Sequence, residues 1–352
     1  MTIYEEHRVS FGDGKTIFYL AAGPLSGPLL IFMHGWPAIA KTWQPQIKAF
    51  ALLGFRVVAP DMPGYGQSTA RHIKSDYSQQ EVVKGMLAVL ADTKRETAVW
   101  VGHDWGCATL WTLANTHPEV CRAVIGLTVP FGTLELGLEE LVKTVDRKLY
   151  PENEFPYGQW DYMVFYEQSF DKASSFFDKG IHGFLNMMMR RVTDPSIIDT
   201  PSFTSTVVKA GGWFGGMDEP PPPEANVPDD AFNMEVEILN ELIAAMEKTG
   251  FGPGDSWYMN HKENREYNLN KTKNNMKLEI PVLFIHARYD FVCQSVIGKL
   301  ADRMRSSCPN LTEKVIDAGH LVASEKPEET NSAIAKWLLE KVPDWWPRVS
   351  SI

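Results

Sequence analysis

The sequence predicts an α/β fold in which a doubly wound, mostly parallel sheet carries an inserted helical lid. Three observations support this prediction. Short apolar runs alternate with segments of helical periodicity over the first 130 residues. The alternation stops at residues 131–277, where helical patterns and aromatic clusters prevail. It resumes from residue 278, so we expect one sheet interrupted by a single insertion.

Residues 1–130 form the first part of the predicted core. Residues 5–23 alternate between polar and apolar side chains and turn at Gly12-Asp13-Gly14, which predicts a β-hairpin. The following apolar runs are continuous, as in parallel strands that are buried on both faces. These strands are expected at 29–33, 55–59, 97–102 and 123–128, with helices that end near 53, span 77–94 and begin at 105.

Residues 131–277 are predicted to form the lid. Glycine and proline are so frequent at 211–216 and 219–223 that an irregular loop is expected across 195–230. An amphipathic helix follows and stops at Gly250. Residues 278–352 complete the predicted core, with strands at 280–285 and 313–317 and a closing helix that carries Ile334, Trp337 and Leu338 on one face.

The composition restricts the possible partners. A formal net charge of −10 and the lack of a basic patch interleaved with aromatic residues argue against a nucleic-acid surface. No apolar stretch is long enough to cross a membrane. We expect a cytoplasmic monomer or homodimer that binds a small uncharged ligand and uses neither cofactor nor metal. Its cysteines lack the spacing of a zinc site or a disulfide framework: Cys107, Cys121, Cys293 and Cys308.

The segment Gly102-His103-Asp104-Trp105-Gly106 joins a predicted strand to a predicted helix. Flanking glycines leave room for a strained turn that lifts the central side chain above the sheet. This pattern resembles the nucleophile elbow of the α/β-hydrolases, with Asp104 in the central position. The alternative is that Asp104 only caps the helix that begins at Trp105.

An aspartate at the elbow predicts a particular chemistry. A carboxylate with an ordinary pKa of about 3.9 is ionised at neutral pH and needs no base in order to attack. Attack at a saturated carbon would leave an ester, whose carbonyl water can then hydrolyse. Asp104 therefore predicts alkyl transfer followed by ester hydrolysis.

Ester hydrolysis needs a base that activates water, and α/β-hydrolases supply it in the chain order nucleophile, acid, histidine. Asp290 follows the predicted strand at 280–285, and His320 follows the last predicted strand. Catalytic groups of open α/β sheets gather at the carboxyl ends of the strands. Taken singly, Asp290 could cap a turn and His320 could lie on the surface. Their order and their shared position at strand ends favour the catalytic interpretation.

The tetrahedral intermediate of ester hydrolysis needs an oxyanion hole. In this fold, one N–H comes from the residue after the nucleophile and another from the loop after an earlier strand. These positions correspond to Trp105 and Trp36. Both indoles are also expected to pack against the core.

Four motifs resemble those of the soluble epoxide hydrolases of the α/β-hydrolase fold, and the resemblance spans nearly the whole chain. They are His34-Gly35-Trp36-Pro37, Gly102-His103-Asp104-Trp105-Gly106, Tyr289-Asp290-Phe291-Val292 and Gly319-His320. The resemblance implies a small apolar epoxide and water as the substrates. It also implies two lid tyrosines that act as acids on the epoxide oxygen.

The first lid tyrosine corresponds to Tyr162 in Trp160-Asp161-Tyr162, and the second to Tyr258 after Trp257. Ring opening releases an alkoxide, to which a phenol with a pKa of about 10 can donate. Tyr166 and Tyr157 remain alternatives to Tyr162, which could instead pack in the lid core.

Three other functions compete with this interpretation. A haloalkane or haloacid dehalogenase shares the aspartate nucleophile but needs halide-binding N–H donors in place of phenols. A serine esterase is excluded by Asp104. A ligand-binding receptor on a hydrolase fold would have no need for Asp104, Asp290 and His320 together.

Overall fold

The sheet at the centre of the molecule runs in the order β1-β2-β4-β3-β5-β6-β7-β8. The computed structural model describes residues 4–348. The strands from β3 onward pair in parallel, whereas β1 and β2 form an antiparallel hairpin that joins β4. The strand bounds are β1 Glu5–Ser10, β2 Thr16–Ala22, β3 Leu29–Met33, β4 Arg56–Pro60, β5 Ala98–His103, β6 Cys121–Leu127, β7 Val282–Ala287 and β8 Leu311–Ile316.

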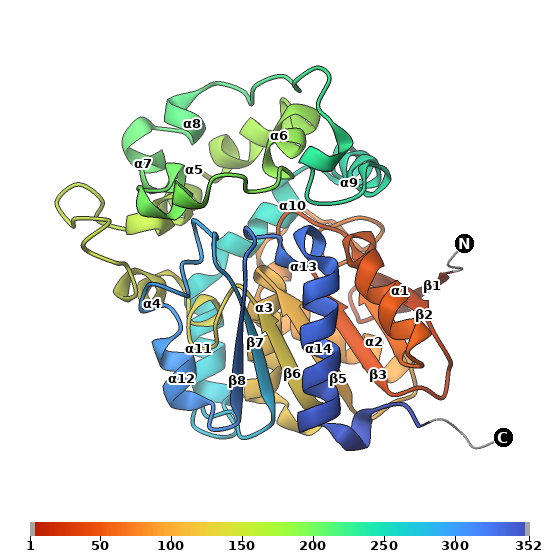
Figure 1. The fold of residues 1–352 in the computed structure, drawn as a ribbon. Helices are drawn as coiled ribbons and strands as arrows, with labels where there is room; N and C mark the ends of the chain where they lie inside the picture. The colour runs from red at the N-terminus through yellow and green to blue at the C-terminus, as the bar shows by residue number, and fades with distance from the viewer. Residues whose placement is uncertain (1–3, 349–352) are drawn as a thin grey trace.

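Helices cover both faces of the sheet, as its doubly wound topology requires (Figure 1). Strands β3, β4, β5 and β7 are buried along their whole length, because side chains on both faces enter a core. One cluster lies beneath α2, α3 and the lid, and the other beneath α1 and α14. The helices that cover the two faces are α1 Gln44–Leu52, α2 Gln79–Asp92, α3 Trp105–Thr116, α11 His261–Lys271, α12 Asp302–Ser307, α13 Val322–Glu325 and α14 Pro327–Lys341.

A second group of helices lies above one end of the sheet (Figure 1). Residues that follow β3, β5 and β7 line one cavity together with lid residues, so the carboxyl ends of these strands face the lid. The remaining helices are α4 Leu138–Lys143, α5 Asp161–Asp178, α6 Ile181–Met188, α7 Val207–Ala210, α8 Trp213–Gly216, α9 Val236–Thr249 and α10 Gly252–Asp255. After α10 the chain returns to the core, where α11 packs against α2 and α3.

The predicted irregular loop is confirmed at residues 217–228, which contain neither helix nor strand. The short helices α7 and α8 precede it, and Phe214 and Gly215 within α8 have positive φ. Trp213 at the start of α8 is buried, and its indole N–H donates to the carbonyl of Ala173 at 3.0 Å. The buried Trp213 side chain thus anchors the glycine-rich segment 211–216 within the lid.

No helix in the described part of the chain is both long and apolar enough to span a membrane. All four cysteines are free thiols, and all four are buried.

Candidate active site

Asp104 lies at the sharp turn between β5 and α3, with φ 53° and ψ −122°. A non-glycine residue with positive φ is strained, and it persists only where its surroundings enforce it. Close backbone packing does so here. A Cβ atom on Gly106 would collide with the carbonyl of Met33, and one on Gly35 would collide with the Asp104 carboxyl. The glycines therefore let β3 and α3 approach closely enough to hold the turn.

The carboxyl of Asp104 meets two backbone donors. The N–H of Trp36 donates to Asp104 Oδ1 at 2.7 Å, and the N–H of Trp105 also interacts with the carboxyl. These are the two groups that the sequence assigned to the oxyanion hole. The structure brings both to the same carboxyl.

His320 bridges Asp104 and Asp290. Its Nδ1 donates to Asp290 Oδ2 at 2.6 Å, and its Nε2 lies 3.6 Å from Asp104 Oδ2. Asp290 is buried, and its second oxygen accepts the backbone N–H groups of Val292 and Cys293 at 3.0 and 2.8 Å. These bonds fix the Asp290 carboxyl, which in turn sets the orientation of the imidazole.

Charge and burial compete at this triad. Burial disfavours the Asp104 carboxylate, but hydrogen bonding and charge from His320 outweigh it and hold the pKa of Asp104 below its ordinary value. Burial likewise disfavours the imidazolium of His320. The charge of Asp290 and hydrogen bonds to Asp104 and Asp290 prevail, so the pKa of His320 is raised well above its ordinary value. The resting site thus holds one cation between two anions.

Tyr162 and Tyr258 lie side by side in the lid, with ring centroids 5.7 Å apart. Tyr258 packs edge-on against the Trp105 indole at 5.0 Å, which places it next to the elbow. Burial raises the pKa of both phenols well above the ordinary value, so both remain protonated donors at neutral pH. Tyr166 stacks on Tyr258 at 4.7 Å and an interplanar angle of 9°.

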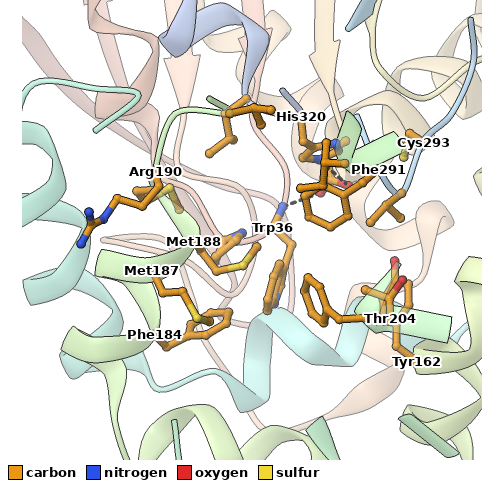
Figure 2. A pocket seen from close by; sticks show the side chains of 18 of the residues that line it. Trp36, Tyr162, Phe184, Met187, Met188, Arg190, Thr204, Phe291, Cys293 and His320 are labelled. Carbon is orange, nitrogen blue, oxygen red and sulfur yellow. Dashed lines mark hydrogen bonds and ion pairs between the residues drawn. The ribbon is translucent and has the colours of Figure 1, made fainter. Parts of the chain in front are cut away.

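A cavity of about 490 Å³ separates the triad from the lid and suits a small ligand. Asp104 and His320 line it on the core side, and Tyr162 and Tyr258 on the lid side. Figure 2 shows His320 and Cys293 on one side of the cavity and Phe184, Met187 and Met188 on the other, with Trp36 between them. The walls are mostly apolar, with aromatic and methionine side chains the most frequent, so the cavity favours an apolar ligand.

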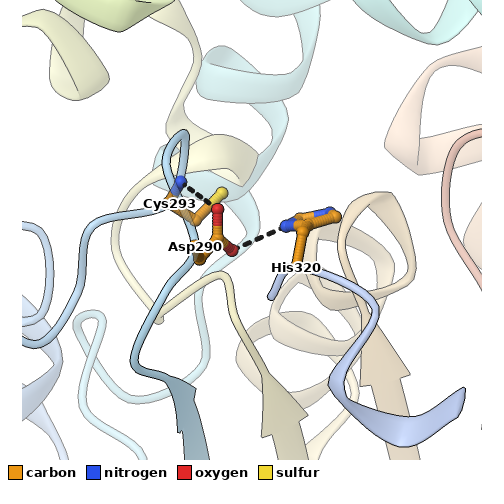
Figure 3. A group of neighbouring side chains, drawn as sticks. All are labelled: Asp290, Cys293 and His320. Carbon is orange, nitrogen blue, oxygen red and sulfur yellow. Dashed lines mark hydrogen bonds and ion pairs between the residues drawn. The ribbon is translucent and has the colours of Figure 1, made fainter. Parts of the chain in front are cut away.

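Cys293 lies beside the Asp290–His320 pair, where the three residues place potential metal ligands within 4.8 Å of one another (Figure 3). Burial raises the pKa of the Cys293 thiol to about 12, so it keeps its proton. Metal binding requires a thiolate, and Asp290 and His320 already satisfy each other. The geometry favours a hydrogen-bonded triad over a metal site.

Two residues of this region were not anticipated from the sequence. His103 lies before the nucleophile, and its Nε2 is 2.8 Å from the carbonyl of His320. The Asp255 carboxyl is fully buried and accepts the indole N–H of Trp36 at 2.7 Å. The position of His103 inside the elbow motif could have indicated that this residue lies at the active site. Nothing in the local pattern around Asp255 indicates that it is buried.

The α/β-hydrolase fold family matches residues 28–159 of the chain. Epoxide hydrolase B of Mycobacterium tuberculosis is 29% identical over 356 aligned positions, which cover 94% of this chain and 98% of that protein. Bifunctional epoxide hydrolase 2 of Sus scrofa is also 29% identical over 316 positions, covering 89% of this chain. This chain spans only 52% of the length of the Sus scrofa protein.

Among solved structures, epoxide hydrolase A of Mycobacterium thermoresistibile superposes with a TM-score of 0.74 at 26% sequence identity. The match covers 96% of this chain and 98% of that one, so it includes both the sheet and the lid. The chain thus has the α/β-hydrolase fold, and its similarity to the epoxide hydrolases, expected from its motifs, is confirmed over nearly its whole length.

Proposed function

We propose that this protein hydrolyses small apolar epoxides to vicinal diols through a covalent ester on Asp104. The observation that carries the proposal is the pairing of an ionised elbow aspartate with two protonated phenols across one apolar cavity. A carboxylate can attack the epoxide carbon while phenols donate to the epoxide oxygen. The named relatives are all epoxide hydrolases, which supports the same reaction.

In the first half-reaction, Asp104 forms an ester bond to one epoxide carbon as the carbon–oxygen bond of the ring breaks. Tyr162 and Tyr258 hydrogen-bond the oxygen and supply a proton to the developing alkoxide. The ester removes the negative charge of Asp104, so the pKa of His320 falls. His320 then releases its proton to the phenolate and becomes a neutral base.

In the second half-reaction, His320 takes a proton from water, and the hydroxide adds to the ester carbonyl of Asp104. The N–H groups of Trp36 and Trp105 receive the oxyanion. Collapse breaks the ester bond, and the proton of the added hydroxyl passes to the departing diol oxygen. Asp104 is again a carboxylate and His320 an imidazolium, as in the resting site.

We further infer that residues 1–130 and 278–352 form the hydrolase core and that residues 131–277 form the lid. The position of α5 to α9 above the sheet supports this division, although α11 packs with the core. We also propose that the protein acts in the cytoplasm, which its four free thiols favour, as a monomer or a homodimer. Neither nucleic acid nor a cofactor has a part in the proposed reaction.

The proposal is tested by turnover of styrene oxide beside a simple haloalkane. We expect diol formation from the epoxide and no halide release, because the site offers two phenol donors to an epoxide oxygen. The indole N–H of Trp36 is already bound to Asp255, whereas the buried indole N–H of Trp105 has no hydrogen-bond partner among the described residues, so halide release is measured beside diol formation. Halide release with no diol would establish the dehalogenase instead.

His320→Gln should separate the two half-reactions. Asp104 needs no base in order to attack, so the variant should open one equivalent of epoxide and then stall as an ester. Intact-mass and peptide analysis should find the mass of the substrate added to the peptide that contains Asp104. A folded variant with neither burst nor adduct would contradict the assignment of Asp104 or that of His320.

Tyr162→Phe and Tyr258→Phe should each slow ester formation, and the double variant should lose nearly all activity. One general acid contributes about 10²- to 10⁴-fold, which sets the scale of the total loss. Single-turnover rates provide the measurement, and circular dichroism verifies the fold. A Tyr162→Phe protein with the wild-type rate would transfer the role to another tyrosine, with Tyr166 the first to test.

The ion pairs of His320 should make stability depend on pH. Its pKa is raised in the fold, so its contribution is complete below the unfolded value of about 6.5 and is lost as the pH rises. Urea unfolding should therefore show the difference between wild type and His320→Gln shrinking at alkaline pH.

His34 provides a comparison of opposite sign. Its Nε2 accepts the N–H of Met62 at 2.9 Å, and burial lowers the pKa of His34 to about 4. Neutral in the fold, it destabilises the protein as the pH falls below about 6.5. The difference between wild type and His34→Gln should therefore grow with pH between about 4 and 6.5. Equal slopes for the two variants would contradict the charge assignments.

A further inference from the structure

We propose that Asp255 is a positioning residue for the reaction, because its carboxyl anchors the indole of Trp36 and so aims the Trp36 backbone N–H at Asp104. The inference rests on the proposed function, in which that N–H receives the oxyanion during ester hydrolysis. It adds a fully buried lid carboxyl to the groups that support the site.

Two hydrogen bonds of Trp36 define the connection. Its backbone N–H donates to Asp104 Oδ1, and its indole N–H donates to Asp255 Oδ1, each at 2.7 Å. Trp36 therefore connects Asp104 to the carboxyl of Asp255, which lies 151 positions further along the chain (255 − 104). We infer that an indole fixed in this way also restrains the backbone that carries the first donor.

Four aromatic side chains also pack around the Trp36 ring, one of them Tyr258 at 6.4 Å. Phe177, Phe184 and Phe251 of the lid lie 5.5 to 5.9 Å from it between ring centroids. Such contacts stabilise a buried ring but specify its rotation weakly, whereas a hydrogen bond is directional. The bond to Asp255 is thus the interaction that selects one orientation of the indole.

The second oxygen of Asp255 lies in a buried polar cluster. The hydroxyls of Ser174 and Tyr166 approach the carboxyl closely enough to favour its ionised form. Neither forms a well-shaped hydrogen bond with it, and Asp255 Oδ2 has no such bond among the described residues. The carboxyl is therefore held through Oδ1, by the Trp36 indole.

The surroundings of Asp255 favour the neutral form of its carboxyl at pH 7. Burial raises its pKa to about 8, although the hydrogen bond from Trp36 and the nearby hydroxyls of Ser174 and Tyr166 act to lower it. The charge of Asp178 acts in the same direction as burial. The other titratable groups that face this turn of the chain are Tyr65 and His72. A neutral acid can accept the indole N–H without placing another negative charge near Asp104.

Two substitutions separate anchoring from packing. Asp255→Asn keeps an acceptor for the indole and mimics the neutral acid, so kcat should remain within about threefold of wild type. Leucine is similar in size to aspartate but cannot accept the indole N–H, so Asp255→Leu leaves a buried donor unpaired. We expect this loss to lower the rate by about 10- to 100-fold. The loss should appear in kcat, with ester accumulating, while kcat/KM, which reports ester formation, stays within about threefold.

Glu135 provides the matched control. It is another fully buried carboxyl whose pKa burial raises, to about 7, but its oxygens accept the N–H groups of Gly132 and Thr133, and it does not line the cavity. Glu135→Gln and Glu135→Leu should change stability without changing the steady-state fraction of ester. A selective loss of kcat in Glu135→Leu would attribute the effect to general loosening of the fold and overturn the proposal.

Three results would overturn the role of Asp255. They are a wild-type kcat in Asp255→Leu, an Asp255→Asn protein as impaired as Asp255→Leu, and an equal fall of kcat and kcat/KM. If Asp255→Leu does not fold, Trp36→Phe removes the same hydrogen bond from the donor side and keeps the backbone N–H. It should show the same loss confined to kcat, and unchanged kinetics would reject the anchor.

A readout without turnover separates this proposal from the proposed function. The indole N–H resonance of Trp36, assigned by its disappearance in Trp36→Phe, should be protected from exchange in wild type and Asp255→Asn. It should shift and exchange faster in Asp255→Leu. If the wild-type protein hydrolyses no epoxide, the proposed function fails, while the resonance still decides whether Asp255 holds Trp36.

Discussion

The strained turn at Asp104 is the constraint on which the rest of the site depends. A positive φ at a non-glycine residue costs roughly 1–3 kcal/mol, and it survives only in a rigid setting. That setting is the middle of the sheet, where β5 pairs with β3 and β6 and is buried along its whole length. Gly35 and Gly106 complete it by letting backbone from β3 and α3 meet around the carboxyl.

Once the elbow is fixed, charge organises its surroundings. Burial by itself favours the neutral form of Asp104, and a neutral carboxyl would be a poor nucleophile. The imidazolium of His320, itself held by Asp290, keeps the carboxyl ionised. The same arrangement makes the basicity of His320 depend on the state of Asp104. A single bond-forming step can therefore convert the histidine from an acid to a base.

The lid covers the cavity and also supplies polar groups for the proposed reaction. Its apolar side chains surround the charged groups with a medium of low polarity, and this strengthens the charge interactions at the site. They also fix the polar groups that the core cannot supply, since Tyr258 is packed between Trp105 and Tyr166. The methionines opposite are flexible and polarizable, so that wall can adapt to the shape of an apolar ligand.

The sequence by itself determined where the strands lie along the chain and which residues follow them. Apolar periodicity and turn chemistry are properties of short segments, which is why the sequence alone places Asp104, Asp290 and His320 at strand ends. Only the tertiary structure decided which distant groups meet and which polar groups lose their water. The bond between Trp36 and Asp255 joins positions 219 apart, and the burial of Trp213 orders a glycine-rich segment. Burial and long-range contact depend on the whole packed chain, so no local pattern encodes them.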